Sequence, residues 1–125
     1  MAWLFLPSGF VSVVGDTTCP GRVLVRARAR EHLVALANQH ADLLGDMKIE
    51  RRTGDYRWAV RVPAEVAGEI ARREVMAAAN YSNFKNEAAR VGGHSSPYVA
   101  ALHKVWSVMV GLQRADDESH RGFRP

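Results

Sequence analysis

Residues 22–30 read RVLVRARAR, and this stretch decides the fold. Side chains in a β-strand alternate between the two faces of a sheet. One face of this stretch is apolar and carries Val23, Val25, Ala27 and Ala29. The other face carries Arg22, Leu24, Arg26, Arg28 and Arg30. The pattern therefore predicts a central strand with one face for a hydrophobic core and one face for water or a partner.

The segments on the N-terminal side of this stretch predict a strand that pairs with it. Residues 3–6 and 9–14 are rich in aromatic and β-branched side chains, which favours one strand interrupted at Pro7, Ser8 and Gly9. The loop GDTTCPG at residues 15–21 is short and rich in turn-forming residues. An antiparallel hairpin is the simplest connection.

On the C-terminal side the apolar period changes from two to 3.6 residues. A helical stripe predicts a helix from about residue 31 that ends at Gly45, and it consists of Leu33, Leu36, Ala37, His40 and Leu44. Residues 48–52 and 56–62 then predict a second hairpin around a Thr-Gly-Asp turn. Strict alternation in the second strand of this hairpin would place four side chains on one face, namely Tyr56, Trp58, Val60 and Val62.

The rest of the chain predicts two further helices. Pro63 suits the first turn of a helix over residues 64–79, and Ser95 or Ser96 followed by Pro97 suits the start of another over residues 98–113. Residues 80–91 predict a less regular connection. Residues 114–125 have mixed charge and few apolar side chains, so we expect a mobile tail after a single domain over residues 1–113.

The resulting order, ββαββαα, predicts an α+β fold with a four-stranded antiparallel sheet and helices on one face. It corresponds to the ferredoxin-like β-α-β-β-α-β plan with the last strand moved to the N-terminus, that is, circularly permuted. The uncovered face would then collect a set of arginines, namely Arg26, Arg28, Arg30, Arg57 and Arg61, with Lys48 and Arg52 joining them if alternation holds.

Composition narrows the class of protein. A chain of 125 residues fits one domain, and the net charge of +4 favours association with polyanions or acidic surfaces. The single Cys19 argues for a reducing cytoplasm. The apolar N-terminal run lacks a basic region and is broken at Pro7, so it predicts neither a signal peptide nor a membrane span. The histidines have no metal-binding spacing, and no metal or cofactor is expected.

The arginine face is the first candidate site. Arginines hold phosphates while planar groups stack on bases, so this face with nearby Phe10 and Tyr56 is a candidate platform for single-stranded nucleic acid. The pattern lacks the aromatic pair that RNA-recognition sheets carry on their central strands. In the alternative interpretation the arginines are solvated and paired with carboxylates of the tail or of a second subunit.

A second candidate is an anion or loop site around Tyr81, Asn83, Lys85, His94 and Ser95. A helix N-terminus offers unsatisfied N–H groups to an anion. In the alternative interpretation the aromatic rings of this segment anchor it to the core and the polar residues satisfy a turn and a helix cap.

Five segments together resemble a family of small uncharacterised bacterial proteins. They are WLFLPSGFVSVV (3–14), VRARAREHL (25–33), DYRWAVRVP (55–63), YSNFK (81–85) and HKVWSVM (103–109). The resemblance implies a bacterial, cytoplasmic, stand-alone domain. It carries no activity, ligand or catalytic residue.

Two functional hypotheses follow. The first is a non-catalytic interaction module that forms a homodimer, because a ferredoxin-like sheet leaves one face uncovered and a second copy can bury it. The second is a module that binds nucleic acid or another polyanion through the arginine face. An enzyme would need convergent polar groups that the sequence does not reveal, and no membrane partner is expected.

Overall fold

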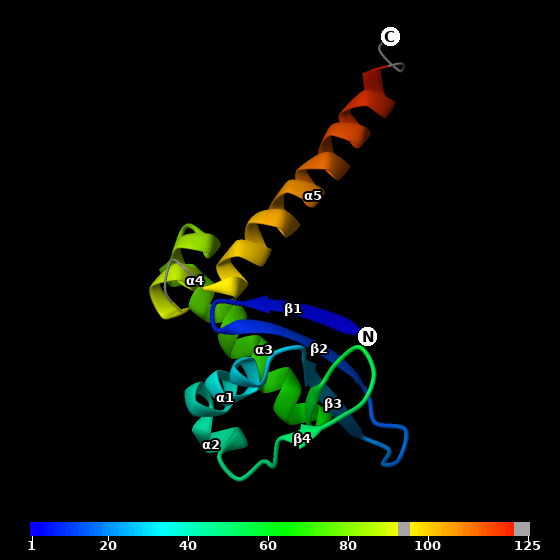
Figure 1. Ribbon diagram of the computed structural model, residues 1–125, viewed down its shortest axis with the longest axis vertical. Helices are drawn as coiled ribbons and strands as arrows, with labels where there is room; N and C mark the ends of the chain where they lie inside the picture. Colours follow the sequence, from blue (N-terminus) through cyan, green and yellow to red (C-terminus); the bar gives the residue numbers. More distant parts are fainter. Residues whose placement is uncertain (93–95, 122–125) are drawn as a thin grey trace.

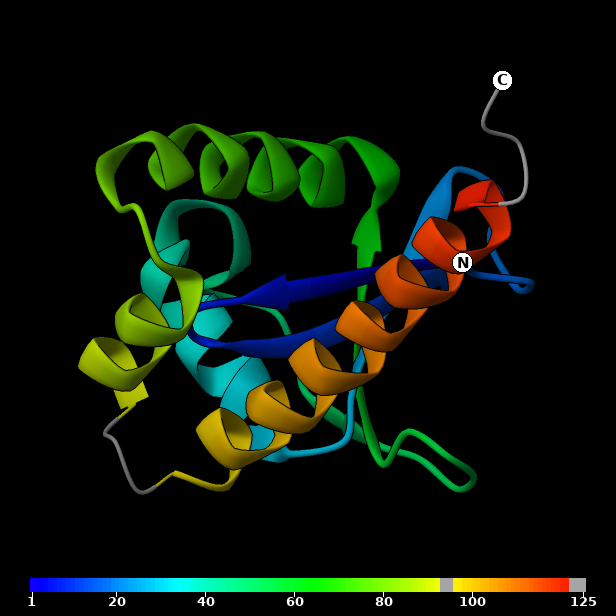
Figure 2. The ribbon, with the colours of Figure 1, turned by 90° about the horizontal axis from the view of Figure 1, so that it is seen from above.

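A computed structural model describes residues 1–92 and 96–121. The fold is α+β, with a single antiparallel sheet in the order β1-β2-β3-β5-β4. The strands are β1 (Ala2–Leu6), β2 (Gly9–Gly15), β3 (Arg22–Ala27), β4 (Glu50–Arg51) and β5 (Trp58–Pro63). The helices are α1 (Arg30–Gln39), α2 (Ala41–Leu44), α3 (Ala64–Ala77), the 3-10 helix η1 (Ala78–Asn80), α4 (Phe84–Gly92) and α5 (Pro97–Arg121). Figures 1 and 2 show α1 and α3 beside the sheet, and Figure 1 shows α5 projecting away from it.

Strand β3 divides its side chains between two faces as the sequence predicts. Val25 is paired with Val13 of β2 and Val60 of β5, and the buried core formed on this face includes Ala27. The helices contribute to the same core with Leu33, Leu36, Leu44 and Ile70. On the opposite face Arg26 lies between Ser12 and Ala59. One face of the sheet therefore packs against helices, and the other presents arginine.

The sheet has five strands where four were predicted. Residues 3–14 do not form one interrupted strand, because the chain reverses at Pro7 and Ser8 and pairs Leu6 with Gly9. Proline fixes φ and lacks an N–H group, which suits a tight turn better than a strand interior. The reversal adds β1 as an edge strand.

Two predicted elements are shorter or divided. The first helix is interrupted at His40, which is buried with its Nε2 2.9 Å from Oε1 of Glu74 in α3. This contact between distant segments lies at the junction of α1 and α2. Strand β4 spans only residues 50–51, where residues 48–52 were predicted.

Two helical segments exceed the prediction. Residues 80–91 are not merely an irregular connection, since they include most of α4, and Oδ1 of Asn83 accepts a hydrogen bond from the N–H of Asn86 at its start. Helix α5 continues to Arg121, past the predicted end at residue 113. Its start is as predicted, because Oγ of Ser96 accepts a hydrogen bond from the N–H of Val99.

The β1–β2 turn lies directly against helix α1. The N–H of Phe10 donates a hydrogen bond of 3.2 Å to Nδ1 of His32. A Cβ placed on Gly9 would lie 2.7 Å from the Cβ of His32 and closer still to its ring. Only glycine allows this approach, so Gly9 sets the distance between the hairpin and α1.

We expect the Gly9→Ala substitution to lower the free energy of unfolding by about 1–3 kcal/mol, because the added methyl group displaces the His32 ring. Urea denaturation measures the change. Gly68→Ala is the matched control, since a Cβ at Gly68 in α3 has open space around it, and alanine there should stabilise the helix by about 0.5–1 kcal/mol. Equal stabilities for the two variants would contradict this account of Gly9.

Candidate binding site on the open face of the sheet

Aromatic rings gather on the face of the sheet opposite the hydrophobic core. Phe5 of β1 and Phe10 of β2 are cross-strand partners, and their rings are stacked with centroids 4.6 Å apart. Trp3 meets Phe10 edge to face at 5.9 Å. Trp3 is 58% exposed and Phe5 37% exposed. Two of the three rings therefore present surface on which a planar ligand could stack.

The side chain of Tyr56 lies between two guanidinium groups. The Cζ atoms of Arg26 and Arg28 are 4.3 and 4.5 Å from the centroid of its ring. Tyr56 precedes β5, so the alternation of that strand does not govern it, and the prediction that it shares the face of Trp58 is wrong. Each cation–π contact contributes about 0.5–2 kcal/mol. Together these side chains form the aromatic–arginine site, which consists of Trp3, Phe5, Phe10, Tyr56, Arg26 and Arg28.

Both arginines of this site keep their charge uncompensated at close range. Within residues 1–92 and 96–121, no carboxylate lies within 4.0 Å of Arg26 or Arg28. Arg26 donates a hydrogen bond to Oγ of Ser12, and Arg28 donates one to the carbonyl oxygen of Asp55. Neutral acceptors orient the two guanidinium groups, so the positive charge remains available to an anion.

Arg61 differs, because carboxylates pair with it. Its Nη1 lies 2.9 Å from Asp16, and its Nε lies 3.2 Å from Glu50. Hydrogen bonds from the hydroxyl and N–H of Thr18, together with Arg61, hold the pKa of Asp16 at about 2. Arg61 is therefore paired with carboxylates of the sheet and an adjoining loop, not with those of the tail or of a second subunit that the alternative interpretation expected.

The other two predicted arginines lie elsewhere. Arg30 opens helix α1, and its Cζ is 6.0 Å from the ring of Trp58, whose cross-strand partner is the core residue Ala27. Arg57 is exposed just before β5, and its carbonyl oxygen accepts a hydrogen bond from the N–H of Arg52. The structure therefore groups only Arg26 and Arg28 with the aromatic rings.

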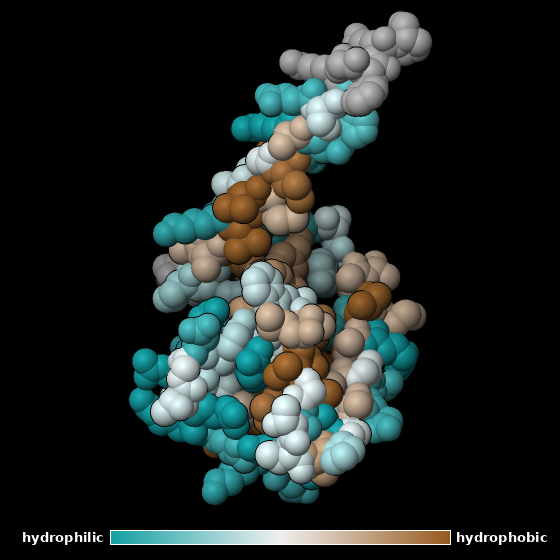
Figure 3. All heavy atoms as spheres, turned by 90° about the vertical axis from the view of Figure 1, so that its right-hand side faces the viewer, coloured by the Kyte–Doolittle hydropathy of each residue, from teal (hydrophilic) through white to brown (hydrophobic). Residues whose placement is uncertain are grey.

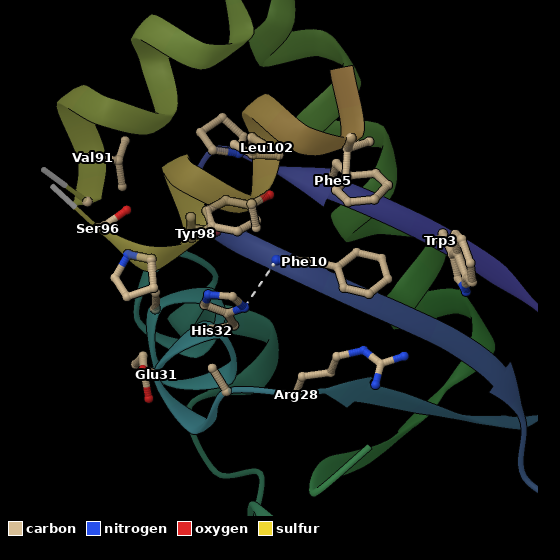
Figure 4. Close-up of a pocket in the computed structure, with 18 of the residues that line it drawn as sticks. Trp3, Phe5, Phe10, Arg28, Glu31, His32, Val91, Ser96, Tyr98 and Leu102 are labelled. Atoms are coloured by element: carbon tan, nitrogen blue, oxygen red, sulfur yellow. Dashed lines mark hydrogen bonds between the residues drawn. The ribbon is translucent and has the colours of Figure 1, made fainter. Parts of the chain in front are cut away.

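A cavity of about 650 Å³ lies between these rings and the first turns of α5. Figure 4 shows Trp3, Phe5 and Phe10 on one side of it, with the side chain of Arg28 extending alongside Phe10. Its wall from α5 includes Leu102 and Val105. Sequence reasoning could not find this wall, because nothing local places residues 98–105 beside residues 3–10.

His32 and Tyr98 line the cavity together. Their rings meet edge to face at 4.9 Å, and the Tyr98 hydroxyl donates a hydrogen bond of 2.7 Å to the carbonyl oxygen of Leu6. Burial lowers the pKa of His32 and raises that of Tyr98. Because Nδ1 of His32 accepts a hydrogen bond from the backbone, the neutral ring carries its proton on Nε2. Besides His32 and Tyr98, sequence reasoning missed Trp3 and Phe5 as residues of this site.

Three residues of the second predicted site lie within the described part of the chain, and each has contacts of its own. Asn83 caps helix α4, whereas Lys85 points toward α5, with Nζ 3.5 Å from Nδ1 of His103. Tyr81 lies by Glu74 and Glu87, and burial is the main cause that raises the pKa of its hydroxyl. His94 and Ser95 lie outside the described residues.

No group of three or more His, Cys, Asp or Glu side chains in the described ranges is placed to hold a metal ion. Across the same ranges, every helix is too short or too polar to cross a membrane. Comparisons with models of protein families, with curated proteins and with solved structures found no significant match.

Protonation of His32 should destabilise the fold. Its pKa is lower in the folded chain than in the unfolded chain, so the unfolded chain binds more protons as the pH falls below about 6.5. The stabilisation is complete above that pH and is lost between about pH 6.5 and the lower pKa of the folded state. We expect the unfolding free energy to fall from pH 7 to pH 5 in urea titrations.

The His32→Asn variant isolates this effect, because its amide oxygen can accept the hydrogen bond of Phe10 but does not titrate. Its stability should change less over the same range of pH. Parallel pH profiles for the variant and the natural protein would show that other groups cause the dependence.

Proposed function

We propose that the protein is a binding module that holds single-stranded nucleic acid on the aromatic–arginine site. One observation carries the proposal: exposed aromatic rings share the face of the sheet opposite the hydrophobic core with two arginines that have no carboxylate within 4.0 Å in residues 1–92 and 96–121. Bases stack on such rings without sequence preference, and guanidinium groups attract phosphates. The net charge of +4 favours the same class of ligand.

The geometry supports a single strand better than a duplex. The rings of Phe5 and Phe10 adjoin a cavity of about 650 Å³, which is within the range of small-ligand pockets. A base must leave its stack to reach such a position, and unpaired bases do so at the least cost. The phosphates would then follow the exposed side toward Arg28. The cytoplasmic location and bacterial origin expected from the sequence remain parts of this proposal.

A finer description of the architecture belongs to the same proposal. Strands β2-β3-β5-β4, taken without β1, have the order of a circularly permuted ferredoxin-like sheet, with α1 and α3 contributing to one core. Strand β1 would be an addition to that plan. It supplies Trp3 and Phe5, so the addition would serve the binding site.

Fluorescence anisotropy of labelled oligonucleotides tests the proposal. We expect micromolar binding of a single strand at about 50 mM salt, weaker binding at about 200 mM salt, and weaker binding of a duplex. Arg28→Glu should weaken binding at least tenfold and reduce the salt dependence. Trp3→Ala should weaken it about five- to a hundredfold, the range measured for the loss of one stacked base.

Lys48→Glu is the matched control for Arg28→Glu, because it changes the charge equally. Lys48 is exposed and precedes β4, the edge strand farthest from β1. Equal losses of affinity for Lys48→Glu and Arg28→Glu would show that the oligonucleotide is held only by a general attraction to a basic protein. Absence of binding at 50 mM salt would eliminate nucleic acid as the ligand.

A further inference from the structure

Within the described residues, the buried side chains of α5 lie near its start. The helix spans residues 97–121, about 37 Å at 1.5 Å per residue. The buried cluster that it forms with α4 contains Val99 and Leu102, and Tyr98 packs against this cluster. From residue 111 onward every side chain described in the helix is exposed. Figure 1 shows this part of the helix projecting from the body.

The projecting part of α5 carries an exposed stripe of apolar side chains. Val105, Met109 and Leu112 have the i, i+4, i+7 spacing of one helix face, and they continue the direction of the buried Leu102. Met109 is 55% exposed, Leu112 60%, and the neighbouring Trp106 56%. Figure 3 shows apolar residues along α5 between the body and the polar end. Such a contiguous exposed stripe on a protruding helix is typical of an interaction surface.

We propose that a second copy of the chain covers this stripe, with the two α5 helices antiparallel. An isologous contact requires that the stripe complement itself. With Met109 at the two-fold axis, Leu112 of each copy lies against Val105 of the other, since the positions three residues after and four residues before Met109 fall on the same side of the helix. The centre of the contact is then entirely apolar.

The charges along α5 favour the antiparallel direction. Its far end carries three consecutive acidic residues, 116–118. Its base carries His103 and Lys104, and Lys85 of α4 lies there too, with Nζ 5.1 Å from the centroid of the Trp106 ring. Antiparallel pairing brings the acidic residues 116–118 of each copy close to the basic residues at the start of α5 in the other copy. Parallel pairing would place the two acidic runs side by side, which is repulsive.

Sedimentation velocity of the full chain from about 5 to 500 µM tests the proposal. We expect a reversible monomer–dimer equilibrium in this range. Met109→Asp places two carboxylates at the axis and should raise the dissociation constant at least tenfold. Ser107→Asp is the matched control: it adds the same charge about 200° around the helix, away from the stripe, and should leave the dissociation constant within about twofold.

Charge reversal tests the direction. Lys85→Glu should weaken the dimer about fivefold, and Lys85→Glu combined with Asp117→Lys should restore it, because antiparallel pairing brings these positions together across the contact. Both residues are at least partly exposed, so the folds should melt alike. A monomer at 500 µM, or a dimer that Met109→Asp does not weaken, would overturn the proposed interface. Failure of the double variant to recover would overturn the antiparallel arrangement.

Discussion

The alternation of side chains along β3 is the constraint on which the rest of the structure depends. β3 lies between β2 and β5, so its register determines which residues of both neighbours face the helices. A shift of one residue would turn Arg26 into the core and Val25 out of it, at a cost that no other contact could offset. The core and the arginine face are therefore two consequences of one pattern.

A second junction connects this sheet to the C-terminal half of the chain. His32 contacts the backbone of the β1–β2 hairpin through Gly9 and Phe10 and packs edge to face on Tyr98. The hydroxyl of Tyr98 in turn donates a hydrogen bond to the carbonyl oxygen of Leu6. The same few residues thus anchor the first turn of α5 and line the cavity.

The aromatic–arginine site combines a structural and a binding role in the same side chains. Tyr56 is 8% exposed because Arg26 and Arg28 cover its ring, and it orders both guanidinium groups in return. A pre-ordered cation loses less conformational entropy when it binds an anion. Arg61, a neighbour on the same face, is instead neutralised by Asp16 and Glu50. Arginines that pair with carboxylates stabilise the fold, and arginines that do not pair with them remain available to bind an anion.

The sequence alone determined the features that depend on local periodicity and helix ends: the two faces of β3, the start of α3 after Pro63, and the start of α5 at Pro97 after a serine cap. Only the tertiary structure decided the face on which Tyr56 lies, the division of a helix at His40 and the wall that α5 adds to the cavity. Each of these depends on a contact between residues about 30 or more positions apart. Local propensity does not encode such contacts, because the packing energy that selects them exists only once the distant segments have met.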